Sequence, residues 1–317
     1  MTHIGGKQLR RGGTAGASEL IAVLLLSASA MVSCGPAERQ GDSPPGERSS
    51  SGSPSRIVSL VPAVTEMLFA IGAGDLVAGV SSFDRHPPEV EALPKVGALL
   101  DPDIERIAVL RPDLLVLYAS QSELRAHIDS MGIGVYEYRH AGLGDVTSTI
   151  RELGAIIGGD ARRKAEAVAT DLESRLADIR SRSAGKERTP TLLVFGREPG
   201  SLRNVLASGG VGFLADLLDV AGGNNVFGAV ARESVPATTE AVLASAPEVI
   251  IELLPSTSTE DFARSARQTW ESASALPAVR NGRVFVLVGD QYVVPGPRLA
   301  EAAEAFWAAI HGTREQD

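Results

Sequence analysis

The chain has 317 residues, and 30 basic against 39 acidic side chains give it a formal net charge of −9 at pH 7. Residues 1–34 contain three of the basic and one of the acidic side chains, so the remainder carries 27 basic and 38 acidic residues and a charge of −11. This negative charge argues against nucleic acid as a partner. Hydrophobic residues make up 44% of the sequence, an ordinary core for one large domain or two lobes within residues 56–311.

The first 34 residues have the pattern of a targeting segment. Basic residues at positions 7, 10 and 11 precede an apolar run, residues 20–30, that is too short for an ordinary membrane span. The run ends at Met31-Val32-Ser33-Cys34, which resembles the lipobox of bacterial lipoproteins, where the cysteine is acylated and becomes the mature N-terminus. We therefore predict that residues 1–34 are a lipoprotein signal peptide with its lipobox and that Cys34 is the lipidation site. A plain secretory signal and a chance cysteine are the alternatives.

Residues 35–55 contain four prolines, four glycines and six serines and have no apolar periodicity. Such a composition cannot bury enough apolar surface to fold, so we predict a disordered tether. A flexible coil of this length spans about 25 Å r.m.s.. It would keep a globular body close to a membrane.

Short apolar strands alternate with helical patterns in two parts of the chain. Residues 57–61 form a β-branched strand that runs into a helical stretch at residues 67–71, and residues 192–195 open the second part similarly. This alternation is typical of an α/β protein with parallel sheets covered on both faces. We predict an N-terminal lobe at residues 56–145 and a C-terminal lobe at residues 185–317. Ligands of such sheets bind at the carboxyl ends of the strands.

Residues 160–182 form the longest uninterrupted helical pattern. Their apolar side chains recur three and four positions apart, at Ala165, Val168, Leu172, Leu176 and Ile179. We expect Asp160 to cap the start of this helix and Gly185 to close its end in a left-handed turn. Its length of roughly 33 Å suits a rod between two lobes, and residues 146–184 are the predicted connecting helical segment. A surface helix on a single domain is the alternative.

The two parts of the chain share an internal pattern that favours two lobes. Glu105 stands seven residues before a proline, which an acidic residue and an apolar strand follow, and Glu240 stands in the same relation to Pro247. In each half a glycine turn and a short strand precede this pattern, and a second glycine turn and strand follow it. Three such features in the same order indicate a structural repeat.

The sequence contains no motif for catalysis or for phosphate binding. The Gly72-Ala73-Gly74 stretch follows a helix and has Val77 where a dinucleotide fingerprint needs its third glycine, and there is no Walker A loop or serine nucleophile elbow. Cys34 is the only cysteine, and the five histidines show no metal-ligand spacing. We therefore predict no catalytic residues, no cofactor and no metal site. His86 and His140 follow strands, where a ligand role and a plain loop role are both open.

Three segments resemble the substrate-binding proteins of ABC importers for cobalamin, ferric siderophores and haem. They are residues 56–80, 87–117 and 237–253, and the resemblance covers residues 56–311. It implies a non-enzymatic protein with two Rossmann-like lobes bridged by a single long α-helix. Among these proteins the cobalamin-binding members are similar at the start of the lobe and at the Pro-Pro-Glu and Leu-Pro-Lys-Val-Gly stretches of residues 87–97.

The resemblance also implies how the protein docks. In this family one exposed glutamate on each lobe pairs with arginines of the two permease subunits, and these glutamates correspond to Glu105 and Glu240. Both positions also suit an acidic residue that interacts with the dipole of the helix it begins. The two roles can coexist.

The resemblance leaves the ligand open, because residues 84–88 are Asp-Arg-His-Pro-Pro where cobalamin binders often have Cys-Asp-Tyr-Pro-Pro. Aromatic faces suit a corrin or porphyrin, whereas arginines suit an anionic ferric chelate. The loop positions expected to contact the ligand are Phe83, Tyr118, Gln121, His140, Arg197, Arg232 and Tyr292.

The sequence therefore predicts a lipid-anchored receptor on the extracytoplasmic, periplasmic face of the cell membrane. Its expected partners are an ABC importer permease dimer, the membrane through the lipid on Cys34, and a small-molecule metal chelate. Cobalamin or another corrinoid is the first candidate ligand, a ferric siderophore the second and haem the third. A lipid-anchored enzyme with its active site between the lobes is an alternative of a different class.

Overall fold

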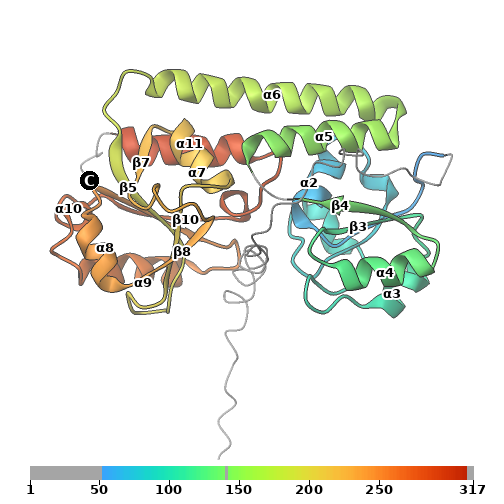
Figure 1. Ribbon diagram of the computed structural model, residues 1–317, viewed down its shortest axis with the longest axis horizontal. Coiled ribbons are helices and arrows are strands. Elements are labelled where there is room, and N and C mark those ends of the chain that lie inside the picture. Colours follow the sequence, from blue (N-terminus) through green and yellow to red (C-terminus); the bar gives the residue numbers. More distant parts are fainter. Residues whose placement is uncertain (1–51, 140–141, 313–317) are drawn as a thin grey trace, which may run out of the picture.

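The structure is a computed structural model that describes residues 52–139 and 142–312. Two α/β lobes lie side by side, and the long helix α6 (Gly159–Ser183) runs along both of them (Figure 1). The predicted fold class is thus confirmed. The predicted signal peptide, lipobox and most of the tether lie outside the described residues, as does His140. No helix of the described part of the chain is long and apolar enough to cross a membrane.

The N-terminal lobe contains a four-stranded sheet in the order β2-β1-β3-β4, with every neighbouring pair parallel. Its strands are β1 (Ile57–Ser59), β2 (Val77–Val80), β3 (Leu114–Tyr118) and β4 (Gly134–Tyr138). Its helical elements are α2 (Pro62–Ala70), η2 (Gly74–Leu76), η3 (Pro88–Ala92), α3 (Ile104–Leu110) and α4 (Ser122–Ser130). Strands β1 and β3 are almost wholly buried because helices cover both faces.

The C-terminal lobe has a sheet in the order β10-β9-β5-β6-β8, and β7 also pairs with β5. The strands are β5 (Thr189–Gly196), β6 (Val205–Ser208), β7 (Gly223–Asn225), β8 (Ser234–Ala237), β9 (Val249–Leu254) and β10 (Val284–Val288). The helical elements are α7 (Phe213–Val220), α8 (Thr239–Ser245), α9 (Glu260–Glu271), α10 (Pro277–Arg280), η4 (Asp290–Tyr292) and α11 (Leu299–His311).

The sequence predicted parallel sheets, but this second sheet is mixed. Strand β6 is antiparallel to both β5 and β8. The connection from β5 to β6 contains no helix, and a parallel pair needs a crossover of about a dozen residues or more. The short connection therefore forces the chain to turn back on itself.

Helix α6 and the preceding α5 (Leu143–Ile157) pack as an antiparallel pair above the lobes (Figure 1). The predicted helix at residues 160–182 is confirmed, and Ala165, Leu172 and Leu176 lie on its buried face. Its capping residue differs from the prediction, because Gly158 with φ 77° is the N-cap and Asp160 lies in the first turn beside Lys164. Two successive glycines with positive φ allow the tight reversal from α5 to α6.

Salt bridges and apolar packing fix α6 to its neighbours. Arg151 of α5 contacts both Glu166 and Glu173 of α6, at 3.0 and 2.7 Å. The largest apolar cluster is continuous from residues such as Met67 in the first lobe, through Leu172, to Phe306 in the second. Because this core crosses from one lobe to the other beneath α6, the connection between the lobes is a packed interface and not a bare linker.

Candidate functional site

The carboxyl ends of β2, β3 and β4 bring polar and aromatic side chains together in the N-terminal lobe. The Ser81 hydroxyl donates to Asp84 Oδ2 at 2.5 Å just after β2. Tyr118 at the end of β3 and Tyr138 at the end of β4 are in edge-to-face contact, with ring centroids 5.9 Å apart. Burial, and to a lesser degree the nearby Asp84, raises the pKa of the Tyr118 phenol, so it stays neutral and can donate a hydrogen bond.

Asp84 is a buried carboxyl group within electrostatic range of Tyr118. Its side chain has no solvent exposure, and its Oδ1 atom has no hydrogen-bond partner among the described residues. Burial raises the pKa of Asp84 to about 6, against hydrogen bonds from Ser81 and Thr65 that lower it. Lys95 donates to the backbone oxygen of Asp84 at 3.1 Å and so holds the loop after β2 in place.

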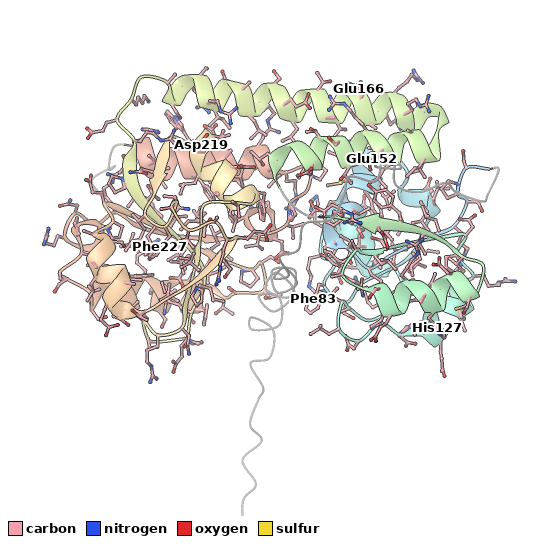
Figure 2. The ribbon with its side chains drawn as sticks, viewed as in Figure 1. Phe83, His127, Glu152, Glu166, Asp219 and Phe227 are labelled. Carbon is pink, nitrogen blue, oxygen red and sulfur yellow. The ribbon has the colours of Figure 1, made fainter. Side chains whose placement is uncertain are left out.

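Gln121 and Phe83, both predicted to contact a ligand, lie at the carboxyl ends of these strands and make different contacts. Gln121 accepts from the Tyr118 backbone at 2.9 Å and donates to the Leu99 carbonyl at 3.0 Å, so its amide joins two loops. Phe83 is half-buried, and its backbone N–H donates to Ser81. Phe83 is labelled in Figure 2, near the middle of the molecule on the side of the first lobe that faces the second.

Arg197, a predicted ligand contact, lies inside the C-terminal lobe. Its side chain is 4% exposed, and Nε lies 2.9 Å from Glu252 Oε1 in the interior of the C-terminal lobe. The guanidinium also donates to the carbonyls of Ser201 and Ala266 and lies 5.7 Å from the Trp270 ring centroid. These contacts hold the guanidinium inside the lobe.

The loop after β10 brings the C-terminal lobe to the N-terminal lobe. Asp290 accepts from the backbone N–H and the hydroxyl of Ser256, which follows β9, at 3.0 and 2.5 Å. Tyr292 is half-buried against the largest apolar cluster. Arg298, at the start of α11, forms a salt bridge with Glu66 of α2, with Nη2 2.5 Å from Oε1.

A carboxylate of the C-terminal lobe lies within electrostatic range of Tyr138. Arg232 is exposed, and the neighbouring Glu233 is half-buried beside Gly212 and Phe213. Burial raises the pKa of Glu233, and this carboxylate lies close enough to contribute to the raised pKa of Tyr138, whose main cause is burial. Tyr138 and Glu233 therefore lie within electrostatic range of each other on opposite lobes. We call the group formed by the half-buried Phe83, Tyr118, Glu233 and Tyr292, together with the buried Tyr138 that contacts Tyr118, the interlobe face.

The two glutamates predicted to dock a permease occupy equivalent positions. Glu105 lies in the first turn of α3, which Asp103 caps, and Glu240 lies in the first turn of α8, which Thr238 caps. Both glutamates are exposed, and both helices have seven residues and end at a residue with a left-handed backbone. Helices α3 and α8 lie on the side of the molecule away from α6, one on each lobe (Figure 1). This geometry matches the sequence repeat, and the docking role stays a prediction.

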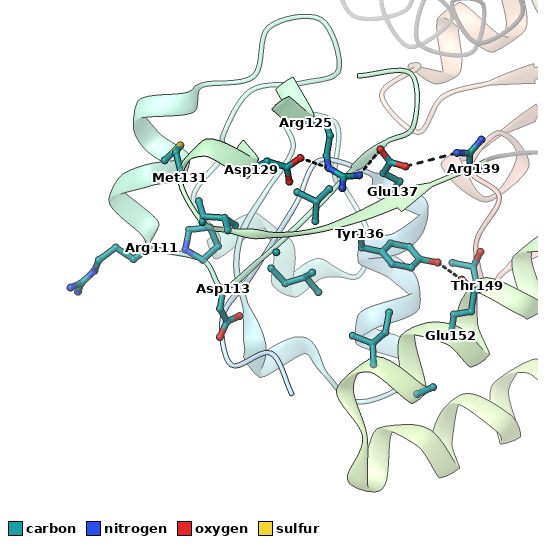
Figure 3. Close-up of a pocket in the computed structure, with 18 of the residues that line it drawn as sticks. Arg111, Asp113, Arg125, Asp129, Met131, Tyr136, Glu137, Arg139, Thr149 and Glu152 are labelled. Carbon is teal, nitrogen blue, oxygen red and sulfur yellow. Dashed lines mark hydrogen bonds and ion pairs between the residues drawn. The ribbon is translucent and has the colours of Figure 1, made fainter. Parts of the chain in front are cut away.

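A separate concavity of about 1420 Å³ lies on the outer side of the N-terminal lobe, along the edge strand β4 (Figure 3). Arg125 of α4 contacts Asp129 and Glu137, both at 2.8 Å, and Tyr136 donates to Glu152 at 2.8 Å. Charged side chains on an edge strand discourage pairing with another chain. No described residue of the interlobe face lines this concavity.

Sequence reasoning missed Asp84, Tyr138 and Glu233. Tyr138 ends β4, and Asp84 closely follows β2. A position at the end of a strand was also the signal that selected Tyr118. Glu233 precedes a short strand, β8, that the sequence did not reveal. In the described part of the chain no group of three His, Cys, Asp or Glu residues is placed to hold a metal ion.

Comparison with known proteins establishes the family. The family model for periplasmic binding proteins matches residues 57–290. The chain belongs to the periplasmic binding protein family. Its members are extracytoplasmic and non-enzymatic components of transport, so the prediction that the protein is not an enzyme is confirmed.

Individual relatives match over most of the fold. An uncharacterized ABC transporter substrate-binding lipoprotein of Bacillus subtilis is 29% identical over 81% of this chain and 80% of its own length. The vitamin B12-binding protein of Salmonella typhimurium is 32% identical over 62% of this chain and 71% of its own length. The protein is therefore a substrate-binding component of an ABC transporter, with a small-molecule ligand.

Solved structures share the fold. The crystal structure of the periplasmic vitamin B12-binding protein of Vibrio cholerae has a TM-score of 0.70 and 24% identity, over 83% of this chain and 99% of that one. The periplasmic heme-binding protein RhuT of Roseiflexus has a TM-score of 0.68 and 25% identity, over 82% of this chain and all of that one.

Proposed function

We propose that the protein binds a corrinoid, such as cobalamin, on its interlobe face and delivers it to the permease dimer of an ABC importer. The observation that supports this ligand best is the half-buried Tyr118, which the buried Tyr138 contacts edge to face, with half-buried Phe83 on the same lobe. Flat aromatic surfaces suit a large planar ring. Curated relatives described as vitamin B12-binding proteins favour the same ligand.

The charges around the interlobe face favour a corrinoid over an anionic ferric chelate. Arg197 is paired with Glu252 in the interior, and Arg298 is paired with Glu66. The half-buried Glu233 carboxylate would repel carboxylates or catecholates, whereas it can accept hydrogen bonds from amide groups. Exposed Arg232 is the feature that keeps a ferric siderophore or haem as the alternative.

We also propose that a lipid on Cys34 anchors the protein to the membrane. The lipobox-like sequence at residues 31–34 and the relative described as a substrate-binding lipoprotein support this anchor. Confinement near the membrane raises the effective concentration of the protein at its permease.

Titration of the purified protein with cyanocobalamin, a ferric siderophore and haem tests the ligand. We expect cyanocobalamin to bind at least tenfold more tightly than the other two, and we expect Phe83→Ala to weaken it at least tenfold. Phe262→Ala, which removes a half-buried aromatic ring from α9, is the matched control and should leave the affinity unchanged. Tighter binding of haem or of the siderophore would overturn the corrinoid assignment.

A further inference from the structure

The Glu66–Arg298 salt bridge joins two residues that belong to different lobes and stand 232 positions apart in the sequence. Glu66 lies in α2, which packs on β1 and β2 of the first lobe, and Arg298 precedes α11, which packs on α7 and β9 of the second. Both pairs of terminal atoms are in contact, with Nε 2.9 Å from Oε2 and Nη2 2.5 Å from Oε1. A two-pronged contact of this kind fixes direction as well as distance.

The pair is buried between the lobes. The Glu66 side chain is 4% exposed and that of Arg298 is 20% exposed, unlike the exposed salt bridges along α6. If the lobes moved apart, the Glu66 and Arg298 charges would separate. Each charge would then lack its partner while it was still only partly solvated. Unpaired buried charge is strongly unfavourable, so the pair resists separation of the lobes.

Polar contacts extend from this salt bridge into the loop that carries Tyr292. Arg298 Nη1 lies 3.4 Å from Gln291 Oε1, and the adjacent Asp290 is held by Ser256 after β9. The loop passes so close to Glu66 that a Cβ atom on Gly296 would lie 2.9 Å from Oε2. The position of residues 289–298 therefore depends on where Glu66 is.

We infer that the Glu66–Arg298 salt bridge fastens the two lobes together and positions the loop of residues 289–298 beside α2. Helix α6 spans the lobes along one side, and this contact fixes them at a second place. Bending of α6 and rotation of the lobes about it are therefore both restricted. Tyr292, on the same loop, then keeps one distance from the aromatic pair of the first lobe. The salt bridge positions this loop in the protein without a ligand. The inference therefore goes beyond the proposed function.

Distances between spin labels on the two lobes test the inference without a ligand. Cysteines replace exposed His127 in α4 and exposed Gln268 in α9, in a chain whose Cys34 is serine so that the labels are the only thiols. The unaltered salt bridge should give one narrow distance distribution by pulsed electron paramagnetic resonance. Glu66→Gln, and Glu66→Met combined with Arg298→Met, should broaden it or shift it by several Å. The double methionine variant keeps apolar volume in place of the charges and is expected to fold.

The matched control removes a salt bridge that does not cross the lobes. Arg182 of α6 contacts Glu304 of α11, and Arg182→Met with Glu304→Met should keep the narrow distribution. Gly296→Ala retains both charges but places a methyl group against Glu66 Oε2, so an intermediate broadening is expected. A distribution as narrow as the unaltered one in every folded Glu66 and Arg298 variant would overturn the inference.

Ligand release gives a second readout that separates this inference from the proposed function. Under the proposed function, cyanocobalamin should dissociate at least tenfold faster from Glu66→Gln than from the unaltered protein, because the loop carrying Tyr292 is no longer held. If the unaltered protein does not bind cyanocobalamin, the proposed ligand is wrong, while the label distances still decide whether the salt bridge holds the lobes.

Discussion

Arg197 and Glu252 form a buried salt bridge between β9 and the residue after β5, with Nε 2.9 Å from Oε1 and side chains 4% and 3% exposed. Trp270 also donates to Glu252 Oε2, at 2.7 Å. Arg197→Met would leave the Glu252 carboxylate buried without its cation. We expect the free energy of unfolding to fall by about 3–5 kcal/mol in urea denaturation.

An exposed arginine of the same loop is the control for Arg197. Arg203 contacts Glu198, with side chains 72% and 37% exposed, and Arg203→Met should change the free energy of unfolding by less than about 1 kcal/mol. An Arg197→Met variant that kept its stability and lost ligand affinity would restore Arg197 as a ligand contact.

Arg197 illustrates what a sequence can and cannot predict in this fold. Arg197 directly follows an apolar strand, so it lies at the carboxyl end of that strand, where ligands of such sheets bind. Its partner stands 55 residues away in another apolar strand, and no local pattern signals that pairing. The Glu66–Arg298 contact is more distant still. By contrast, the limits of α6 and the equivalence of Glu105 with Glu240 depend on periodicity and spacing within short segments, and those the sequence predicted well.

The buried Asp84 predicts a pH dependence of stability. Its pKa is about 6 in the folded protein against 3.8 for the ordinary group, so the folded state binds the proton more tightly than the unfolded chain. The contribution of Asp84 to stability is then present below about pH 4 and is lost as the pH rises to about 6. Asp84→Asn should therefore raise the free energy of unfolding at pH 7 by up to about 3 kcal/mol.

Urea denaturation at a series of pH values measures this difference. The gain from Asp84→Asn should shrink towards zero at about pH 4, because the carboxyl group is then neutral in both states. Exposed Asp101→Asn is the control and should show no such trend. A gain that stays constant across the pH range would argue that the effect is one of packing and not of charge.

Leu172 lies in the middle of the buried face of α6. Leu172→Pro should lower the free energy of unfolding by about 3 kcal/mol or more, because proline removes a backbone hydrogen bond and clashes with the preceding turn. Thermal unfolding and small-angle scattering should report lower stability and altered placement of the lobes. Unchanged values of both would mean that α6 does not hold the lobes.

The lipobox-like sequence predicts that Cys34→Ser releases the protein from membranes without affecting the folded lobes. Cell fractionation and incorporation of labelled fatty acid test this, and circular dichroism checks the fold. Ser33→Ala leaves the cysteine in place and is the control. Equal fatty-acid labelling of the unaltered and Cys34→Ser proteins would exclude Cys34 as the lipidation site.

Glu105 and Glu240 predict how the protein meets a two-fold permease. Each is exposed at the start of an equivalent helix, and hydrogen bonds from its own backbone N–H and from Thr238 hold the pKa of Glu240 below its ordinary value. The Glu240 carboxylate is thus charged at neutral pH and available to a permease arginine. Two weak surface ion pairs on one rigid body act together, since the second forms at high effective concentration once the first is made.

We therefore expect Glu105→Arg with Glu240→Arg to abolish uptake in cells, with each single variant intermediate, while the ligand affinity of the isolated protein stays within a few-fold of the original. Asp171→Arg with Glu187→Arg makes the same change in charge at exposed positions in and just after α6 and should leave uptake normal. Charge pairs of this kind mainly steer association, so the defect of the single variants should grow as added salt screens the remaining pair. Normal uptake by the double variant, or loss of its ligand binding, would show that these glutamates do not form the docking contact.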